Sequence, residues 1–118
     1  MFLNFYMLIR LAHEQAVVPP HWEYEIANAM LTASRRARIP VEQVATRLAL
    51  LRNLPVSVDV ASIELAMTRS LDLAQAHSLT VYDAAYLELG VRLQSPVATL
   101  DRNLAGAVRE EGLEVLGS

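Results

Sequence analysis

Short β-prone runs alternate with amphipathic helical segments along this chain, and this alternation constrains the fold more than any other feature. Strands are expected at residues 16–18, 56–58, 97–100 and 113–116. Helices with apolar residues three and four apart are expected at 21–38, 41–51, about 59–77, 81–93 and 101–111. This order predicts an α/β domain with a parallel sheet, helices on both faces, and ligands bound beyond the carboxyl ends of the strands. With 118 residues, we expect one domain over 1–118.

The amino-terminal segment is apolar but is not a membrane span. Residues 1–14 lack glycine and proline, which favours a helix that is apolar around most of its circumference. The apolar run at 2–12 contains Asn4 and Arg10 and falls short of the roughly 20 residues that a span needs. It also lacks the flanks of a signal peptide, and cysteine is absent from the chain. We therefore expect a cytoplasmic protein without disulfides.

The charge balance excludes a globally basic, nucleic-acid-binding surface. The formal charge is −3, from ten arginines, no lysine and thirteen acidic residues. The basic run Arg35, Arg36 and Arg38 is explained either by a solvated helix end or by contact with phosphate or an acidic partner. A DNA-binding regulator is disfavoured because no basic recognition helix is present.

Three acidic residues stand where the predicted topology brings segments together. Glu25 lies in the first turns of the helix after one strand, Asp83 begins another helix, and Asp101 directly follows a strand. Because the carboxyl ends of parallel strands share one edge of the sheet, the three are expected to converge. Each also has a structural explanation: Asp101 as an N-cap, Asp83 as the capping-box partner of Thr80, and Glu25 as a solvated first-turn residue.

The remaining polar and aromatic residues carry weaker signals. Asn28 shares a helix face with Glu25. The histidines at 13, 21 and 77 have no metal-ligand spacing and are interpreted as structural or surface residues. The aromatic residues are interpreted as core or interface anchors in preference to base-stacking platforms; these are Trp22, Tyr24, Tyr82 and Tyr86.

Three segments together resemble conserved blocks of the VapC-type PIN-domain toxins in order and spacing. They are VPPHWEYEIANAM at 18–30, LTVYDAAYLEL at 79–89 and VATLDRNL at 97–104, and the resemblance extends over about 16–116. It implies a PIN-like three-layer α/β/α fold and a metal-dependent endoribonuclease that is the toxin of a toxin–antitoxin pair. It also implies an RNA substrate, a cognate antitoxin and a homodimer, for which the amino-terminal helix is a candidate interface.

The resemblance assigns catalytic and metal-binding roles to Glu25, Asp83 and Asp101, and supporting roles to Thr99 and Asn28. The expected ion is Mg²⁺ or Mn²⁺, because hard cations prefer carboxylate oxygens and can activate a water against a phosphodiester. One metal or two would serve.

The chain departs from the family at its amino terminus. Members normally open with a hydrophobic strand that ends in an aspartate, and here the chain starts too late for that strand; Asn4 is not accepted as a substitute. The missing strand is the central one of the sheet, and the missing acid is a metal ligand. We therefore expect that Met1 is an internal start and that the native protein carries further residues upstream. A chain that is naturally this short is expected to be inactive or to exchange strands in a dimer.

The main alternative from another class is a catalytically silent PIN-fold module that dimerises and binds an antitoxin. Cleavage of a structured RNA with Mg²⁺ or Mn²⁺ separates the two hypotheses, when the chain is compared with Asp83→Asn and Asp101→Asn.

Overall fold

A five-stranded mixed sheet organises the molecule, which measures 41 × 30 × 28 Å. The computed structural model describes residues 8–10 and 16–117. The strands lie in the order β3-β2-β1-β4-β5, with β2 parallel to β3, β4 parallel to β5, and β1 antiparallel to both neighbours. Their bounds are Leu8–Arg10 (β1), Ala16–Val18 (β2), Val56–Val58 (β3), Val97–Ala98 (β4) and Val115–Leu116 (β5).

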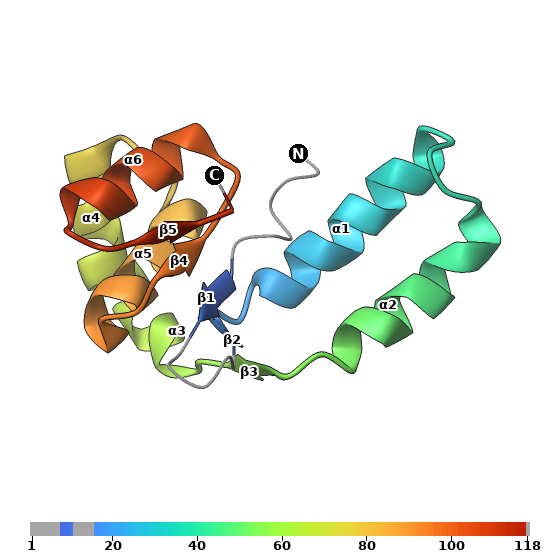
Figure 1. Cartoon of the computed structure of the whole chain (residues 1–118), viewed down its shortest axis with the longest axis horizontal. Helices are drawn as coiled ribbons and strands as arrows, with labels where there is room; N and C mark the ends of the chain where they lie inside the picture. The colour runs from blue at the N-terminus through green and yellow to red at the C-terminus, as the bar shows by residue number, and fades with distance from the viewer. Residues whose placement is uncertain (1–7, 11–15, 118) are drawn as a thin grey trace.

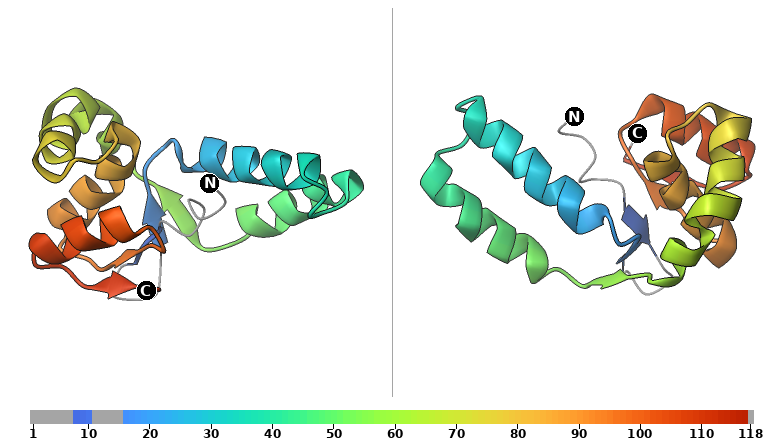
Figure 2. Two further views of the ribbon diagram at one scale, coloured as in Figure 1. Left: turned by 90° about the horizontal axis from the view of Figure 1, so that it is seen from above. Right: turned by 180° about the vertical axis from the view of Figure 1, so that it is seen from behind.

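Helices lie on both sides of the sheet, which confirms the predicted α/β class (Figures 1 and 2). On one side are α1 (Trp22–Arg35), the 3-10 turn η2 (Val41–Gln43) and α2 (Val44–Arg52), which form a projecting hairpin. On the other side are α3 (Ala61–Leu65), the π-helical segment η3 (Ala66–Ser70), α4 (Leu71–His77), α5 (Val81–Leu93) and α6 (Arg102–Glu110). None of the helices in these described segments is long and apolar enough to cross a bilayer.

Strand β1 corrects two predictions about the amino-terminal segment. Leu8–Arg10 form a strand and not part of a helix, while the other residues of the predicted helix 1–14 lie outside the described residues. β1 pairs with β2 and β4 and so fills the central sheet position that we expected to be empty. β1 runs antiparallel to both neighbours, so the prediction of a parallel sheet is wrong at this strand. In this position it pairs backbone groups on two neighbours that would otherwise present open edges.

The hydrophobic core lies around α5. The buried residues of the core come from β2, α1, α5, β4 and α6, and they are Val17, Val18, Trp22, Ile26, Tyr86, Leu87, Leu89, Val97, Leu104, Ala107 and Val108. Leu48 and Leu51 of α2 pack against this cluster, as their helical spacing predicts. Because α5 is buried from Ala84 to Gly90, its first turn is held in a fixed position against the sheet.

Helical spacing over 59–77 predicts an inward face made of Ile63, Ala66, Met67, Leu71 and Ala74. Ala74 is buried as predicted, but the prediction is wrong for Ile63, Met67 and Leu71. Ile63 is 63% exposed and Met67 is 86% exposed, whereas Ser62 and Ser70 are buried. Ser62 turns inward because its backbone N–H and its hydroxyl both donate to Oδ2 of Asp59, at 3.0 and 2.8 Å. Ile63, next to Ser62, then faces solvent. The wider π-helical turn of η3 shifts the phase within and after Ala66–Ser70, so a uniform helical period assigns the wrong face to Met67 and Leu71.

Candidate active site

The carboxyl ends of β2 and β4 lie at the same edge of the sheet, because both strands run antiparallel to β1. After β2, Pro19 and Pro20 end the strand and α1 begins at Trp22, which places Glu25 in the first turn of that helix. After β4, Asp101 begins α6. Asp83 comes from the first turn of α5, where its backbone N–H donates to Oγ1 of the N-cap Thr80 at 3.1 Å.

Glu25 and Asp83 line one open pocket of about 440 Å³. Among the described residues, its lining consists of His21, Tyr24, Glu25, Asn28, Thr80, Tyr82 and Asp83. The pocket thus joins the start of α1 to the start of α5. Asn28 faces it together with Glu25, as expected for residues three apart on a helix.

A buried tyrosine holds the Glu25 carboxylate in place. The Tyr86 hydroxyl donates a hydrogen bond to Oε1 of Glu25, and Nε2 of His21 lies 3.7 Å from the same oxygen. Burial raises the pKa of Glu25; the Tyr86 hydrogen bond offsets part of that change, and the charge of Asp83 adds to it. Glu25 is therefore a fixed carboxylate in an environment that disfavours its ionised form.

Asp83 and Asp101 are electrostatic neighbours. Burial raises the pKa of Asp83, and the negative charge of Asp101 raises it further, while Thr80 acts in the opposite direction. Glu25 interacts with Asp83, and Asp83 with Asp101, so the three acids predicted to converge form a chain of mutually repelling charges. A hard cation would relieve this repulsion, and the donor set consists of oxygen atoms, which Mg²⁺ prefers.

The fit to a metal is nevertheless incomplete. In the part of the chain that the structure describes, no group of three or more histidine or acidic side chains is arranged to hold a metal ion. Glu25 and Asp83 supply two carboxylates that line one pocket, and Asp101 is not among the residues that line it. Donor chemistry and charge therefore fit a divalent cation, but these residues alone do not form a closed ligand set.

Asp101 has a structural role in addition to its place near Asp83. Its Oδ1 accepts hydrogen bonds from the backbone N–H groups of Asn103 (2.8 Å) and Leu104 (3.1 Å), so it is the N-cap of α6. Thr99 is buried, and its Oγ1 accepts from the backbone N–H of Asp101 at 3.0 Å. The orientation of Asp101 is thus fixed from both sides along the chain.

Sequence reasoning did not place His21, Tyr24, Tyr82 or Tyr86 at this site. Tyr86 is buried in the core as predicted, but it also bonds Glu25. Nε2 of His21 lies 3.0 Å from the backbone oxygen of Tyr82, and its ring makes edge contacts with the rings of Tyr82 and Tyr86, at 5.7 and 5.2 Å between centroids. Burial lowers the pKa of His21, which favours the neutral ring. The spacing of Tyr86, three residues after Asp83 on one helix, was the available signal. No spacing marks His21, because its ring partners are distant in sequence.

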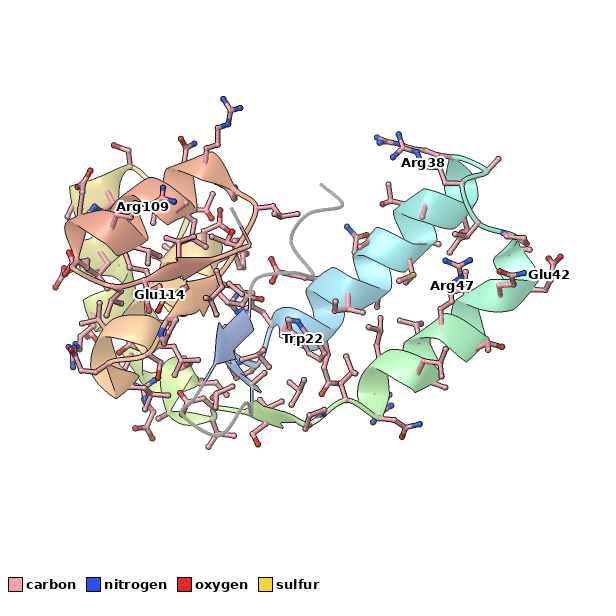
Figure 3. All side chains as sticks on the ribbon, viewed as in Figure 1. Trp22, Arg38, Glu42, Arg47, Arg109 and Glu114 are labelled. Carbon is pink, nitrogen blue, oxygen red and sulfur yellow. The ribbon has the colours of Figure 1, made fainter. Side chains whose placement is uncertain are left out.

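The basic run found in the sequence lies away from the acids. Arg38 is at the outer tip of the α1–α2 hairpin, whereas Trp22 is at its base (Figure 3). Trp22 is followed closely by Glu25 in the first turn of α1, so the length of this 14-residue helix separates the two charge groups. This arrangement gives no support to phosphate binding by this run at the acidic pocket.

Comparison with known proteins gives one informative similarity. No family model matches the chain. Over 82 residues, the chain is 33% identical to "Ribonuclease VapC3" of Pyrobaculum aerophilum. The match covers 70% of this chain and 63% of the relative, so the chain spans less than two thirds of the relative's length.

Proposed function

We propose that this chain belongs to the VapC-type PIN-domain proteins and is a metal-dependent endoribonuclease that hydrolyses RNA phosphodiesters; its similarity to "Ribonuclease VapC3" supports this proposal. In this proposal it is the toxin of a toxin–antitoxin pair and acts in the cytoplasm. The relative's name supplies the ribonuclease activity, and the pocket shared by Glu25 and Asp83 supplies a place for it.

The observation that carries the proposal is the meeting of acids from separate segments. Glu25 and Asp83 come from helices that begin far apart in sequence, yet they line the same pocket, and Asp83 interacts with Asp101. Acidic side chains that repel one another cost folding free energy. A group of them held together therefore indicates a functional site and not a set of stabilising interactions. A hydrogen bond from the buried Tyr86 hydroxyl, 61 residues away in sequence, fixes the Glu25 carboxylate in the pocket.

In the proposed mechanism, Glu25, Asp83 and Asp101 would hold Mg²⁺ or Mn²⁺. Such an ion supplies charge neutralisation at the phosphodiester and lowers the pKa of an attacking water. The chain's own residues prepare the site: Tyr86 fixes the Glu25 carboxylate, Thr80 fixes the first turn of α5, and Thr99 fixes the backbone of Asp101. Asn28, which lines the pocket beside Glu25 on α1, would orient substrate or water.

The test compares metal-dependent cleavage by matched variants. A structured RNA is incubated with the chain in Mg²⁺ or Mn²⁺, and then with Asp83→Asn, Asp101→Asn and Asp72→Asn, an exposed acid on α4 that serves as the control. We expect the two site variants to lose about 100-fold or more of the rate, because even the outer partners of metal ligands contribute 10- to 100-fold. We expect the control to retain the parent rate.

Binding of Mn²⁺, followed by electron paramagnetic resonance, provides a readout that does not require cleavage. Weaker binding by Asp83→Asn than by Asp72→Asn is expected. Equal cleavage in all four proteins would exclude these acids as the active site.

A catalytically silent binding module is the second candidate, and the incomplete ligand set among the described residues favours it. Such a module would retain the fold and bind an antitoxin without cutting RNA. In either case, an antitoxin segment that covers the pocket would carry basic residues to match Glu25 and Asp83. Antitoxin binding without any metal-dependent cleavage would favour the silent module.

The homodimer that the family resemblance implies is part of the proposal, and sedimentation equilibrium of the chain tests it.

A further inference from the structure

We propose that Tyr24 and Tyr82 form a nucleobase-binding wall of the acidic pocket, on which an unpaired base of the RNA stacks. The inference rests on the proposed function, because it assigns base-binding residues to the same pocket. These two residues were expected to be core or interface anchors in preference to base-stacking platforms, and their exposure contradicts the interpretation as core anchors.

Both tyrosines are exposed where the acids are. Tyr24 is 82% exposed and Tyr82 is 67% exposed, yet both line the pocket that contains Glu25 and Asp83. Tyr86, by contrast, is completely buried. Aromatic side chains stabilise a protein mainly when they are buried, and these two rings are not. Two exposed rings on one small pocket therefore indicate a surface that contacts a ligand.

The two rings come from different elements. Tyr24 projects from the first turn of α1, and Tyr82 from the first turn of α5. The backbone oxygen of Tyr82 lies 3.0 Å from Nε2 of His21, whose ring also meets the Tyr82 ring edge-on. Tyr82 is therefore oriented before any ligand binds, which lowers the entropy lost on binding.

The chemistry of the pocket favours a base over a phosphate as the group that contacts this wall. Its charged lining residues are acidic, so a phosphate would be repelled there in the absence of a cation. A base carries no charge and stacks on aromatic rings, and Asn28 in the same pocket offers both a donor and an acceptor to a base edge. Paired bases have their faces covered by neighbours, so the base must come from a single-stranded segment.

A protein partner is the competing occupant. A second groove of about 240 Å³ adjoins the pocket and shares Tyr82 and His21 with it, but its other lining residues are mainly apolar, among them Ile63 and Val81. Tyr24 does not line this groove in the described structure. A partner seated in the groove would therefore depend on Tyr82 and not on Tyr24, whereas a base in the pocket would depend on both.

The experiment measures stacking directly. A single-stranded RNA that contains 2-aminopurine is titrated with the full chain carrying Asp83→Asn, which slows cleavage, in Mg²⁺. Quenching of 2-aminopurine reports stacking, and anisotropy reports affinity. Each tyrosine is changed to leucine, which removes the ring, and to phenylalanine, which keeps it. Met67→Ala, an exposed apolar residue outside the pocket, is the control.

We expect each leucine variant to weaken single-strand binding by about 5- to 150-fold and to lose the quenching, as for loss of one stacked base. The phenylalanine variants and Met67→Ala should stay within about 2-fold of the parent. The matching duplex should bind less tightly and show no ring-dependent quenching. Leucine variants that keep both affinity and quenching would overturn the inference, as would a parent that does not quench the single strand.

Two further outcomes separate this inference from the proposed function. Tyrosine-dependent stacking without metal-dependent cleavage by the unsubstituted chain would remove the nuclease proposal and leave the RNA-binding wall in place. If both leucine substitutions, made without Asp83→Asn, leave cleavage at the rate of the unsubstituted chain, the nuclease proposal stands and the wall is removed. A change in antitoxin affinity or in oligomeric mass on Tyr82→Leu, with RNA binding unchanged, would assign the surface to a protein partner.

Discussion

Tyr86 and Glu25 are 61 residues apart in sequence, and the buried hydroxyl of the tyrosine donates a hydrogen bond to Oε1 of the glutamate. The bond connects α5 to α1 at Glu25, which lines the acidic pocket. Since Tyr86 is buried in the core, it fixes this carboxylate oxygen of Glu25. A rigidly held carboxylate of this kind suits a residue that has to meet a ligand in a defined geometry.

Tyr86→Phe is expected to lower RNA cleavage by about 10- to 100-fold, the range for loss of a group that orients a ligand-binding residue. The Tyr86 hydrogen bond lowers the pKa of Glu25, so its removal raises that pKa further. The acid limb of the pH–rate profile should therefore move to higher pH, because Glu25 must be ionised to act. Tyr82→Phe is the control. An unmoved acid limb in Tyr86→Phe would contradict the assigned role.

Local signals predicted much of this structure. The helix predicted at 81–93 has those bounds, because Thr80 caps it and Leu93 is followed by a left-handed Gln94. Asp101 caps α6 as its position after a strand predicts. In both cases, information close in sequence determines the local backbone. Glu25 and Asp83 were expected to converge from their positions at helix starts and from the family resemblance, and they line one pocket.

The errors arise where distant parts of the chain decide the outcome. An apolar run without polar alternation does not distinguish helix from strand, so the sheet position of Leu8–Arg10 was not predicted. Met67 was expected inside because a regular helical period was assumed, and η3 interrupts that period. Ile63 was expected inside as well, but Ser62, which is bonded to Asp59, takes the inward position. His21 was assigned a structural or surface role because its contacts with Tyr82 and Tyr86 depend on how α5 packs beside α1.

The acidic cluster predicts an unusual dependence of stability on pH. The pKa of Asp83 is raised in the folded state, so the folded chain binds more protons than the unfolded chain between the ordinary pKa of 3.8 and the raised value. Stability should fall as the pH rises through that window. Asp83→Asn should therefore stabilise the chain at pH 7, by a few tenths to about 1 kcal/mol because the site is partly solvated, and the gain should vanish below pH 3.8. Thermal melts against Asp72→Asn check this, and a loss of stability at pH 7 would contradict it.

Divalent cations are expected to offset the same repulsion. At a concentration of Mg²⁺ or Mn²⁺ about 100-fold above the dissociation constant, the free energy of unfolding should increase by about 2.7 kcal/mol. The increase should be much smaller in Asp83→Asn, and it should disappear on acidification, because protonated carboxyl groups do not bind the cation. Melting curves at fixed ionic strength, with Na⁺ as the control, measure it. An equal increase in Asp83→Asn would place any bound cation elsewhere.

Arg92 is expected to be essential for stability, although it lies outside the pocket. Its Nε and Nη2 donate to Glu88, which is 0% exposed, at 2.9 and 3.0 Å, and Nη2 donates to Asp59 at 2.6 Å. Arg92→Met would leave the buried Glu88 without its cation, so we expect a loss of about 2 to 4 kcal/mol in chemical denaturation. Glu88→Leu combined with Arg92→Met should recover part of that loss. Arg47→Met, at an exposed arginine that donates to Gln43, is the control and should change little.

The pair Gly90→Ala and Gly106→Ala tests how tightly α5 is packed against the sheet. A Cβ on Gly90 would lie 2.6 Å from Cγ2 of Val97 in β4 and 3.3 Å from Cδ1 of Leu113, whereas a Cβ on Gly106 would meet nothing within 4 Å. Alanine is favoured over glycine by about 1 kcal/mol within a helix, so Gly106→Ala should stabilise the chain by up to that amount. At Gly90 the overlap with β4 should exceed this gain and give a net loss of about 1 to 2 kcal/mol. Because α5 also carries Asp83 and Tyr86, the displacement should reduce RNA cleavage as well, while Gly106→Ala should leave cleavage unchanged. Equal stabilisation by the two substitutions, measured by urea denaturation, would show that α5 is not in close contact with β4.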